Sequence, residues 1–327
     1  MRAVLVEEFG PPSSLVVKDL PDLRPGPGEV VIEVVAASVN FPDILVVEGT
    51  YQNLPQRPFS PGKEATGRVV AVGEGVERIV LGQRVLALVE YGGYAEQLVV
   101  PEELVVELPD EVGFEQAAAV GLVYATAHFG LRRRGQLCAG ETVLITGAGG
   151  GVGSAGVQLA KSWGARVIAL AQDEAKGELA RKQGADVVLT SGPETLRDDL
   201  LAATDGHGVD VVLEMLGGEY LTQVVRATAW EGRIVIVGFA SGSQTPIKPG
   251  HLLVKNISVT GLQSSDYRDR HPALTRATMT EVLELLGRGD VDAAIDTVFP
   301  LERASDALQY VRDGKVKGKV VLTTGLA

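Results

Sequence analysis

The residues with the clearest chemical potential form a glycine-rich stretch, Thr146-Gly-Ala-Gly-Gly-Gly-Val-Gly153. Gly147, Gly150 and Gly153 keep the GxxGxxG spacing, and Gly151 and Val152 complete the turn. An apolar run precedes the stretch, and a helix-length segment follows it to about residue 163. Glycine at such a turn lets the backbone approach a pyrophosphate, and a helix N-terminus offers unpaired N–H groups and a positive dipole end. The context predicts a dinucleotide site, and a glycine turn without a ligand is the alternative.

The elements that must position this turn lie between residues 140 and 265. Six apolar runs alternate there with helix-length segments, at residues 142–146, 167–170, 187–189, 209–213, 234–237 and 257–262. Strands that alternate with helices form right-handed crossovers and a mostly parallel sheet covered on both faces. The pattern predicts an α/β fold with a Rossmann doubly wound six-stranded parallel sheet, whose first strand leads into the glycine turn.

The flanking segments have a different texture. Short apolar runs at residues 30–35, 67–72, 84–89 and 98–100 are separated by Gly and Pro, which predicts a β-rich domain. The tail offers helices near 272–287 and 302–312 and strands near 294–299 and 319–323. A chain of 327 residues favours two cores. We expect one domain from residues 1–122 and 294–327, and a dinucleotide-binding domain from residues 123–293.

Composition limits the partners and the compartment. A net charge of −12 opposes binding to nucleic acid or to an anionic membrane, because both require clustered Lys or Arg. The basic run at residues 132–134 is best interpreted as a solvated face. The single cysteine, Cys138, excludes an intramolecular disulfide. The first residues lack the apolar core of a signal peptide, and no apolar stretch is long enough to span a membrane, so we expect a cytoplasmic protein.

Cofactor choice is encoded at the end of the second predicted strand. An NAD enzyme usually carries a carboxylate there for the ribose 2′-hydroxyl, whereas this strand ends at Gln172. Asp173 and Glu174 follow, and we interpret them as helix N-cap groups. Lys176 has the charge and position to meet a 2′-phosphate, although it could equally be solvated. The pattern favours NADP(H) over NAD(H).

Motifs along most of the chain resemble one family. They are Ser38-Val-Asn-Phe-Pro-Asp43, Pro61-Gly-Lys-Glu64, Val72-Gly-Glu-Gly-Val76, Gly92-Gly-Tyr-Ala-Glu96, Thr126-Ala, the glycine turn, Val237-Gly-Phe-Ala-Ser-Gly242 and Gly318-Lys-Val-Val-Leu322. Together they resemble the zinc-free quinone oxidoreductase branch of the medium-chain dehydrogenase/reductase superfamily. The resemblance implies a GroES-like, partly open barrel for the β-rich domain. It also implies a homodimer or homotetramer paired through the sixth strand of the parallel sheet, an edge that would otherwise lie exposed.

The resemblance also implies site residues. Asn40 is expected beside the nicotinamide ribose and Tyr51 near the substrate, where a phenol could donate a proton to an enolate. Packing of the Tyr51 ring against a domain interface is an equal alternative, and Asp43 is expected to be a hydrogen-bond acceptor in a turn or between the domains. The family positions that contact nicotinamide and its ribose are Thr126, Phe239, Ala240 and Ser241, and Gly217 with Gly218 keeps the cleft floor open.

Some positions depart from the family pattern. Gln172 stands where many bacterial quinone reductases have a serine near the adenosine phosphate, and Ser191 stands where they have a tyrosine. An arginine often seen near Val46 is missing, which suggests an acceptor other than a simple quinone. Asn40-Phe41 and Lys63-Glu64 occupy the positions of the Cys-His and His-Glu pairs of the zinc alcohol dehydrogenases. The four histidines show no ligand spacing, so we expect no metal site.

Without a metal, the expected chemistry is hydride delivery from NADPH to an electron-poor acceptor. Quinones are the leading acceptor class. Reduction of the C=C bond of an enone, a 2-alkenal or an enoyl thioester is the alternative, although a basic rim for a CoA substrate is not evident. A third possibility is a protein that binds NADPH without significant turnover.

Overall fold

A computed structural model of the chain describes residues 1–326, which form two compact units. One contains residues 1–122 and those from 265 onward, and the other contains residues 123–264. The sequence placed the second boundary near residue 294, and this was wrong. The helices α8 (Ser264–Arg270) and α9 (Pro272–Gly287) precede that point, and α9 packs on η2 (Glu102–Leu104) and β7 (Val105–Glu107) of the first unit. Its buried apolar side chains therefore belong with the first unit rather than with the second.

The unit of residues 123–264 is built on a parallel sheet of six strands in the order β10-β9-β8-β11-β12-β13. The strands are β8 (Thr142–Thr146), β9 (Arg166–Leu170), β10 (Val187–Leu189), β11 (Val209–Glu214), β12 (Thr228–Ile236) and β13 (Ser258–Gly261). The helices are α3 (Gly151–Ser162), α4 (Glu174–Lys182), α5 (Pro193–Ala203), α6 (Gly218–Ala227) and α7 (Pro249–Lys255), and α2 (Phe114–His128) leads into the unit. The predicted doubly wound fold is confirmed.

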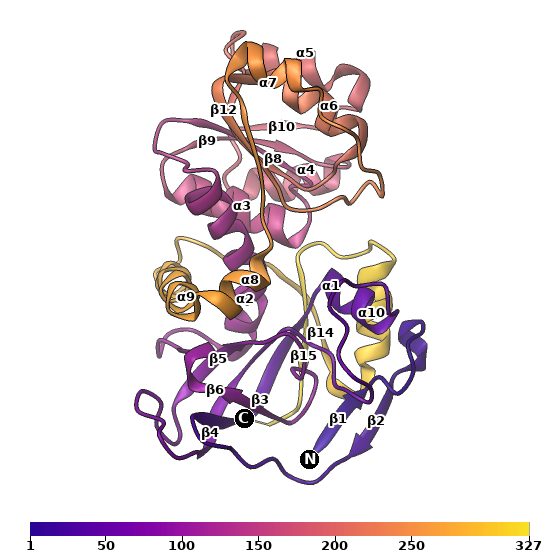
Figure 1. Cartoon of the computed structure of the whole chain (residues 1–327), viewed down its shortest axis with the longest axis vertical. Coiled ribbons are helices and arrows are strands. Elements are labelled where there is room, and N and C mark those ends of the chain that lie inside the picture. The colour runs from indigo at the N-terminus through magenta and orange to yellow at the C-terminus, as the bar shows by residue number, and fades with distance from the viewer. Residues whose placement is uncertain (327) are drawn as a thin grey trace. The chain divides into compact units, whose positions relative to one another are not determined.

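Helices cover both faces of this sheet, with α3 and α4 on one face and α5, α6 and α7 on the other (Figure 1). The strand order reverses between β8 and β11, which start crossovers in opposite directions. In such sheets, ligands bind outside the carboxyl ends of the strands at this switch point. The glycine turn follows β8 at that place.

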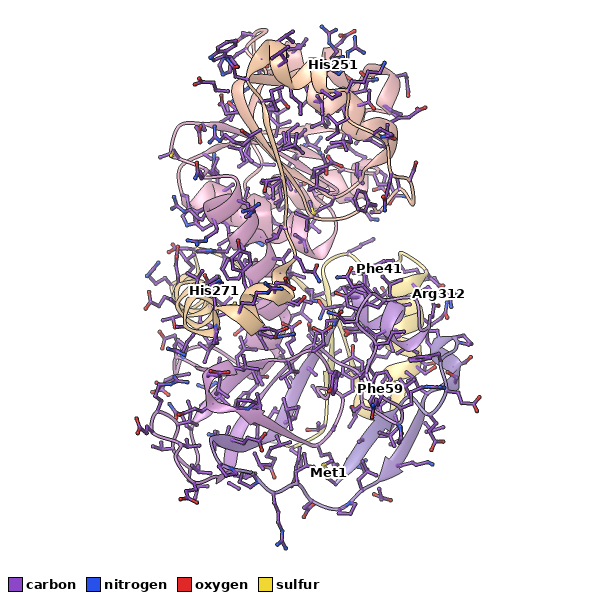
Figure 2. The ribbon with its side chains drawn as sticks, viewed as in Figure 1. Met1, Phe41, Phe59, His251, His271 and Arg312 are labelled. Atoms are coloured by element: carbon purple, nitrogen blue, oxygen red, sulfur yellow. The ribbon has the colours of Figure 1, made fainter. Side chains whose placement is uncertain are left out.

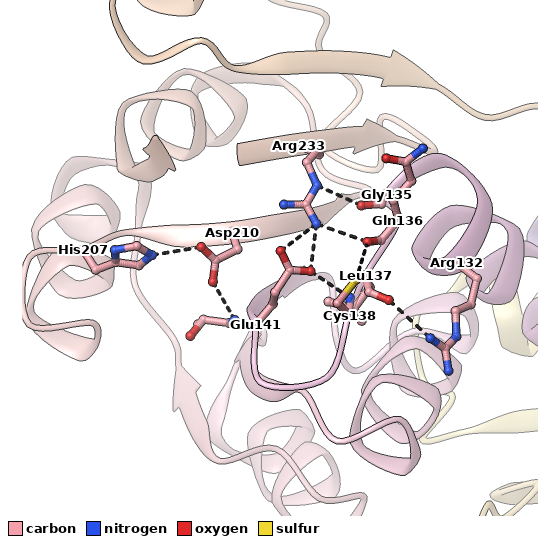
Figure 3. A network of polar contacts seen from close by, with 10 residues as sticks. Arg132, Gly135, Gln136, Leu137, Cys138, Glu141, His207, Asp210 and Arg233 are labelled. Atoms are coloured by element: carbon pink, nitrogen blue, oxygen red, sulfur yellow. Dashed lines mark hydrogen bonds and ion pairs between the residues drawn. The ribbon is translucent and has the colours of Figure 1, made fainter. Parts of the chain in front are cut away.

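A polar network lies at the opposite end of the same sheet, away from the glycine turn (Figure 3). The Arg233 guanidinium donates to both carboxylate oxygens of Glu141 at 2.8 Å and to Gly135 O at 3.0 Å. Asp210 accepts the Thr142 N–H at 2.8 Å, and its other oxygen lies 2.9 Å from His207 Nε2. These contacts join the amino ends of β8 and β11 to each other and to Arg233 of β12, so this network has a structural role.

The other unit is β-rich. Its main sheet has seven strands: β3 (Glu29–Val39), β4 (Glu64–Val72), β5 (Arg84–Leu88), β6 (Gln97–Pro101), β7, β14 (Ile295–Pro300) and β15 (Lys319–Thr323). A separate pair contains β1 (Arg2–Leu5) and β2 (Val16–Asp19). The remaining elements are η1 (Pro12–Ser14), α1 (Phe41–Val47), η4 (Leu301–Arg303) and α10 (Ala304–Arg312).

The long strand β3 organises this sheet because it changes partners along its length. Its first half pairs with β6 and β4, and its second half pairs with β15, with register shifts against β4 after Val31 and Val34. Irregularities of this kind bend a strand and increase its twist, which curls a sheet toward a barrel. The predicted β-rich second domain is confirmed. None of the helices within residues 1–326 is both long and apolar enough to cross a bilayer.

Candidate cofactor site and active site

The glycine turn has the close packing that a dinucleotide site requires. Gly147 has a φ of +62°, a conformation that favours glycine. A Cβ on Gly153 would lie 2.3 Å from Gly147 O and 2.7 Å from Ala148 Cα, so only glycine lets α3 start this close to the turn. Gly150 is the N-cap residue, and Gly151 and Val152 begin the helix. The first N–H groups of α3 therefore point out of the helix end and are available to an anion.

Lys176 lies directly against this turn. A Cβ on Gly149 would meet the Lys176 Cβ at 2.6 Å, so the lysine side chain passes over the glycine backbone. Its ammonium donates to Gln172 Oε1 at 2.8 Å. The Asp173 side chain caps α4 by accepting the Lys176 N–H at 2.9 Å, which confirms the N-cap interpretation of Asp173. The cap fixes the first turn of α4 and thereby the start of the lysine side chain.

Ser191 has a different environment. It lies after β10, and its hydroxyl donates to Asp199 Oδ2 at 2.6 Å. In this arrangement the hydroxyl proton is committed to a carboxylate, which would itself repel a phosphate. The described contacts of Ser191 are thus with a carboxylate, whereas Lys176 brings a positive charge to the glycine turn.

The loops after β11 and β12 form one double loop. Met215 O and Leu216 O accept the N–H groups of Ala240 at 2.8 Å and of Ser241 at 3.0 Å. Gly217 has a φ of +72°, and a Cβ there would lie 2.8 Å from the ring of Phe239. The fold thus brings the predicted residues Gly217, Phe239, Ala240 and Ser241 together beside the switch point. The remaining prediction, Thr126, is largely buried in α2.

In the β-rich unit, buried polar side chains gather around Asn40, at the start of α1. Its Oδ1 accepts the ammonium of Lys319 at 2.7 Å, and its Nδ2 donates to Glu64 Oε1 at 2.8 Å. All three side chains are buried. Because an ammonium can only donate and a carboxylate only accepts, these partners fix which end of the Asn40 amide points each way. We call Ser38, Asn40, Asp43, Glu64, Tyr94 and Lys319 the Asn40 cluster.

Asp43 completes the turn that carries Asn40. Its Oδ2 accepts the Asn40 N–H and the Tyr94 hydroxyl, both at 2.8 Å. Burial raises the pKa of Asp43 to about 6, and the nearby Lys63 and these hydrogen bonds oppose that rise. Burial likewise raises the pKa of Tyr94 well above its usual range, and the Asp43 charge adds to the effect. Burial has the opposite effect on Lys319: it disfavours the charged ammonium and so lowers the pKa of Lys319.

Tyr51 contacts a second charged group. The Lys63 ammonium lies 4.6 Å from the centre of the Tyr51 ring, within the range of a cation–π contact. The same ammonium pairs with Glu90 Oε1 at 2.6 Å, and Glu90 Oε2 lies 2.9 Å from the Arg268 guanidinium. Phe41, the first residue of α1, is 59% exposed (Figure 2). The exposed ring of Phe41 thus directly follows the buried Asn40 in the sequence.

Known proteins match this chain over nearly its whole length. The model of the alcohol dehydrogenase GroES-like domain matches residues 26–110, and that of the zinc-binding dehydrogenase matches residues 151–279. A quinone oxidoreductase-like protein 2 homolog of Nematostella vectensis is 38% identical over 327 residues, covering 99% of this chain and 89% of that protein. The chain belongs to the quinone oxidoreductase branch of the medium-chain dehydrogenase/reductase superfamily. It is thus an oxidoreductase with a nicotinamide cofactor.

Two solved structures extend this comparison. A mycobacterial protein, Rv1454c, complexed with NADPH, is 32% identical with a TM-score of 0.90 and covers 99% of this chain and 100% of that chain. The CurK enoyl reductase is 28% identical with a TM-score of 0.87 and covers 98% of both chains. The names of these relatives thus include both a quinone oxidoreductase-like protein and an enoyl reductase.

One of the two matching family descriptions names zinc. The residues of this chain do not fit a zinc site. Lys63 brings a positive ammonium to a position where a zinc enzyme has a ligand, and Asn40 already accepts the Lys319 ammonium. Ammonium groups repel a cation and offer it no lone pair. His251 and His271 lie on separate units (Figure 2). Over residues 1–326, no group of three or more His, Cys, Asp or Glu side chains is arranged to hold a metal.

Sequence reasoning missed several members of the Asn40 cluster as site residues. Lys319, Glu64 and Tyr94 all lie in motifs that carried the family resemblance, and that was the available signal. They come from β15, β4 and the loop before β6. Only the folded sheet brings such distant segments together.

Proposed function

We propose that this protein is an NADPH-dependent, zinc-independent reductase that transfers hydride to a quinone. The observation that carries the proposal is the packed glycine turn at the switch point, with Lys176 lying across it. A cation beside the N-terminus of α3 suits a cofactor that has a 2′-phosphate in addition to its pyrophosphate. The NADPH in the mycobacterial relative supports the same cofactor.

The chain's own groups would hold the cofactor in three places. The N–H groups at the start of α3 would bind the pyrophosphate, and Lys176 would pair with the 2′-phosphate. The double loop that contains Gly217 and residues 239–241 would support the nicotinamide half, with Thr126 in α2. When bound, this cofactor supplies the hydride for the reduction.

The β-rich unit would contribute the acceptor side. Tyr51 would donate its phenolic proton to the acceptor oxygen as negative charge develops there, and the Lys63 ammonium near its ring would stabilise the charge left on the phenol. Both ends of the Asn40 amide are hydrogen-bonded to buried side chains. We therefore propose that Asn40 shapes this site and does not transfer a proton. Asp43 holds the turn in which Asn40 lies.

Reduction of a C=C bond next to a carbonyl is the second candidate function. It uses the same hydride and the same proton donor, and the enoyl reductase relative supports it. A protein that binds NADPH without turnover is the third. The quinone is preferred because the relative that matches 99% of this chain at 38% identity carries that name.

We also propose a homodimer, or a homotetramer, paired through β13. This strand lies at the edge of the six-stranded sheet. On the preceding helix α7, Leu253 is 79% exposed and Val254 is 67% exposed. Sedimentation should give a dimer or a tetramer, and Val254→Glu should weaken it, whereas a monomeric parent protein would contradict the proposal.

Oxidation of NADPH and NADH tests the function directly. Each cofactor is mixed with a benzoquinone, a naphthoquinone, 2-alkenals and an enoyl-CoA, and the loss of reduced nicotinamide absorbance is followed. We expect turnover with quinones and a preference for NADPH. Turnover confined to alkenals or the enoyl thioester would support the second candidate, and tight NADPH binding without turnover would support the third.

A further inference from the structure

The loop after β11 has its N–H groups turned inward onto two buried side chains. Met215 N–H donates to Thr146 Oγ1 at 2.8 Å. The N–H groups of Leu216 and Gly217 donate to Glu214 Oε1 at 2.8 and 2.7 Å. Thr146 and Glu214 are the last residues of β8 and β11, and both are fully buried. Three consecutive N–H groups are thus held by the ends of the two strands that flank the switch point.

This inward arrangement determines what the loop presents to its neighbours. The carbonyls of residues 215 and 216 face the other way and accept the N–H groups of Ala240 and Ser241. The Gly218 N–H donates to Ser243 O at 3.0 Å and closes the pair of loops. A Cβ on Gly147 would lie 3.7 Å from the Leu216 side chain, so the same loop borders the glycine turn.

A buried carboxyl group such as that of Glu214 lowers the stability of the fold unless its hydrogen bonds compensate. A buried carboxyl group loses its hydration, and burial raises the pKa of Glu214 although the two N–H groups oppose that rise. An apolar side chain at the end of β11 would avoid the loss of hydration. It could not accept the two N–H groups, and the loop would lose its shape.

We propose that Glu214, assisted by Thr146, is a positioning residue for the nicotinamide half of the cofactor. It holds residues 215–218, and through them residues 239–243, in the shape that binding requires. This inference rests on the proposed function, which places the nicotinamide on these loops. Glu214 itself need not contact the cofactor.

Comparing the binding of two ligands distinguishes a positioning role of Glu214 from a general effect on the stability of the fold. NADPH contains the nicotinamide half, whereas 2′,5′-ADP carries only the adenosine and phosphate half. Calorimetric titration of Glu214→Ala should give a Kd for NADPH that rises about tenfold, or about 1.4 kcal/mol, with a Kd for 2′,5′-ADP within about twofold of the parent value. Glu214→Gln should stay within about threefold for both ligands, because its amide oxygen still accepts the N–H groups. Glu219→Gln, at an exposed position of α6, is the matched control.

Three results would overturn the inference. They are an unchanged Kd for NADPH in Glu214→Ala, an equal rise for both ligands, and a Glu214→Gln variant as impaired as Glu214→Ala. If Glu214→Ala does not fold, Thr146→Val removes the acceptor for Met215 and should show the same selective loss. A parent protein that neither binds nor oxidises NADPH would overturn the proposed function as well, whereas an active parent with unaffected Glu214 and Thr146 variants would overturn this inference alone.

Discussion

In residues 123–264 the candidate ligand contacts are made largely by backbone, whereas in the β-rich unit they are made by side chains. The glycine turn offers N–H groups and space, and the Lys176 side chain packs across it. Around Asn40, by contrast, buried charges and hydroxyl groups from separate strands satisfy each other. We expect a site built from backbone to lose function when a substitution adds volume to it. We expect a cluster of buried polar side chains to lose stability when a substitution removes a hydrogen-bond or charge partner.

The largest effect should follow from loss of the buried cation in the Asn40 cluster. Lys319→Met leaves Asn40 Oδ1 and Val39 O without their donor and leaves the buried carboxylates without its charge. We expect the free energy of unfolding to fall by about 4 kcal/mol, measured by denaturant titration. Lys315→Met, on a 62% exposed side chain, is the control and should change it by less than about 0.5 kcal/mol. Equal losses in the two variants would show that the cluster is no more sensitive than the surface.

Asp43 should make stability depend on pH. An unfolded aspartate loses its proton near pH 4, whereas the folded one keeps it to about pH 6. The contribution of Asp43 is therefore fully present below about pH 4 and is lost as the pH rises through 6, which amounts to about 2–3 kcal/mol. The stability of the parent protein relative to Asp43→Asn should fall by this amount between pH 4 and pH 7.5. Asp19→Asn, at an exposed position, is the control for the loss of one carboxyl group. A difference between the parent protein and Asp43→Asn that stays constant with pH would contradict the assignment.

The backbone site should be sensitive to volume alone. Gly153→Ala places a methyl group against Gly147 O and Ala148 Cα, and backbone cannot move aside as a side chain can. We expect the Kd for NADPH to rise about thirtyfold, or about 2 kcal/mol. Gly250→Ala in α7, where an added Cβ meets no atom within 4 Å, is the matched control. Unchanged binding in Gly153→Ala would mean that α3 does not need to start so close to the turn.

The smallest effect should distinguish the two cofactors. Lys176→Ala removes the cation beside the glycine turn, and the Kd for NADPH should rise about tenfold while that for NADH stays within about twofold. Lys182→Ala, exposed at the end of the same helix, should leave both unchanged. An equal loss for NADPH and NADH would assign Lys176 to the pyrophosphate or to the packing of the turn instead.

Sequence by itself determined the parts of this protein that depend on local pattern. Alternating apolar runs predicted all six strands of the parallel sheet, because strand and helix periodicities are properties of neighbouring residues. Glycine spacing located the turn after β8, and Asp173 was identified as a helix cap from its place before α4. These features depend on residues only a few positions apart.

Tertiary structure decided the rest. The helix α9 joined the β-rich unit because its apolar face packs on η2 and β7, a partner that its own sequence does not specify. Lys319 meets Asn40 only because β15 pairs with β3, nearly the whole chain away in sequence. Thr146 accepts the Met215 N–H only because β11 lies beside β8 in the parallel sheet. A buried charge is stable only when the fold brings it a partner, so such contacts depend on the whole topology rather than on any local pattern.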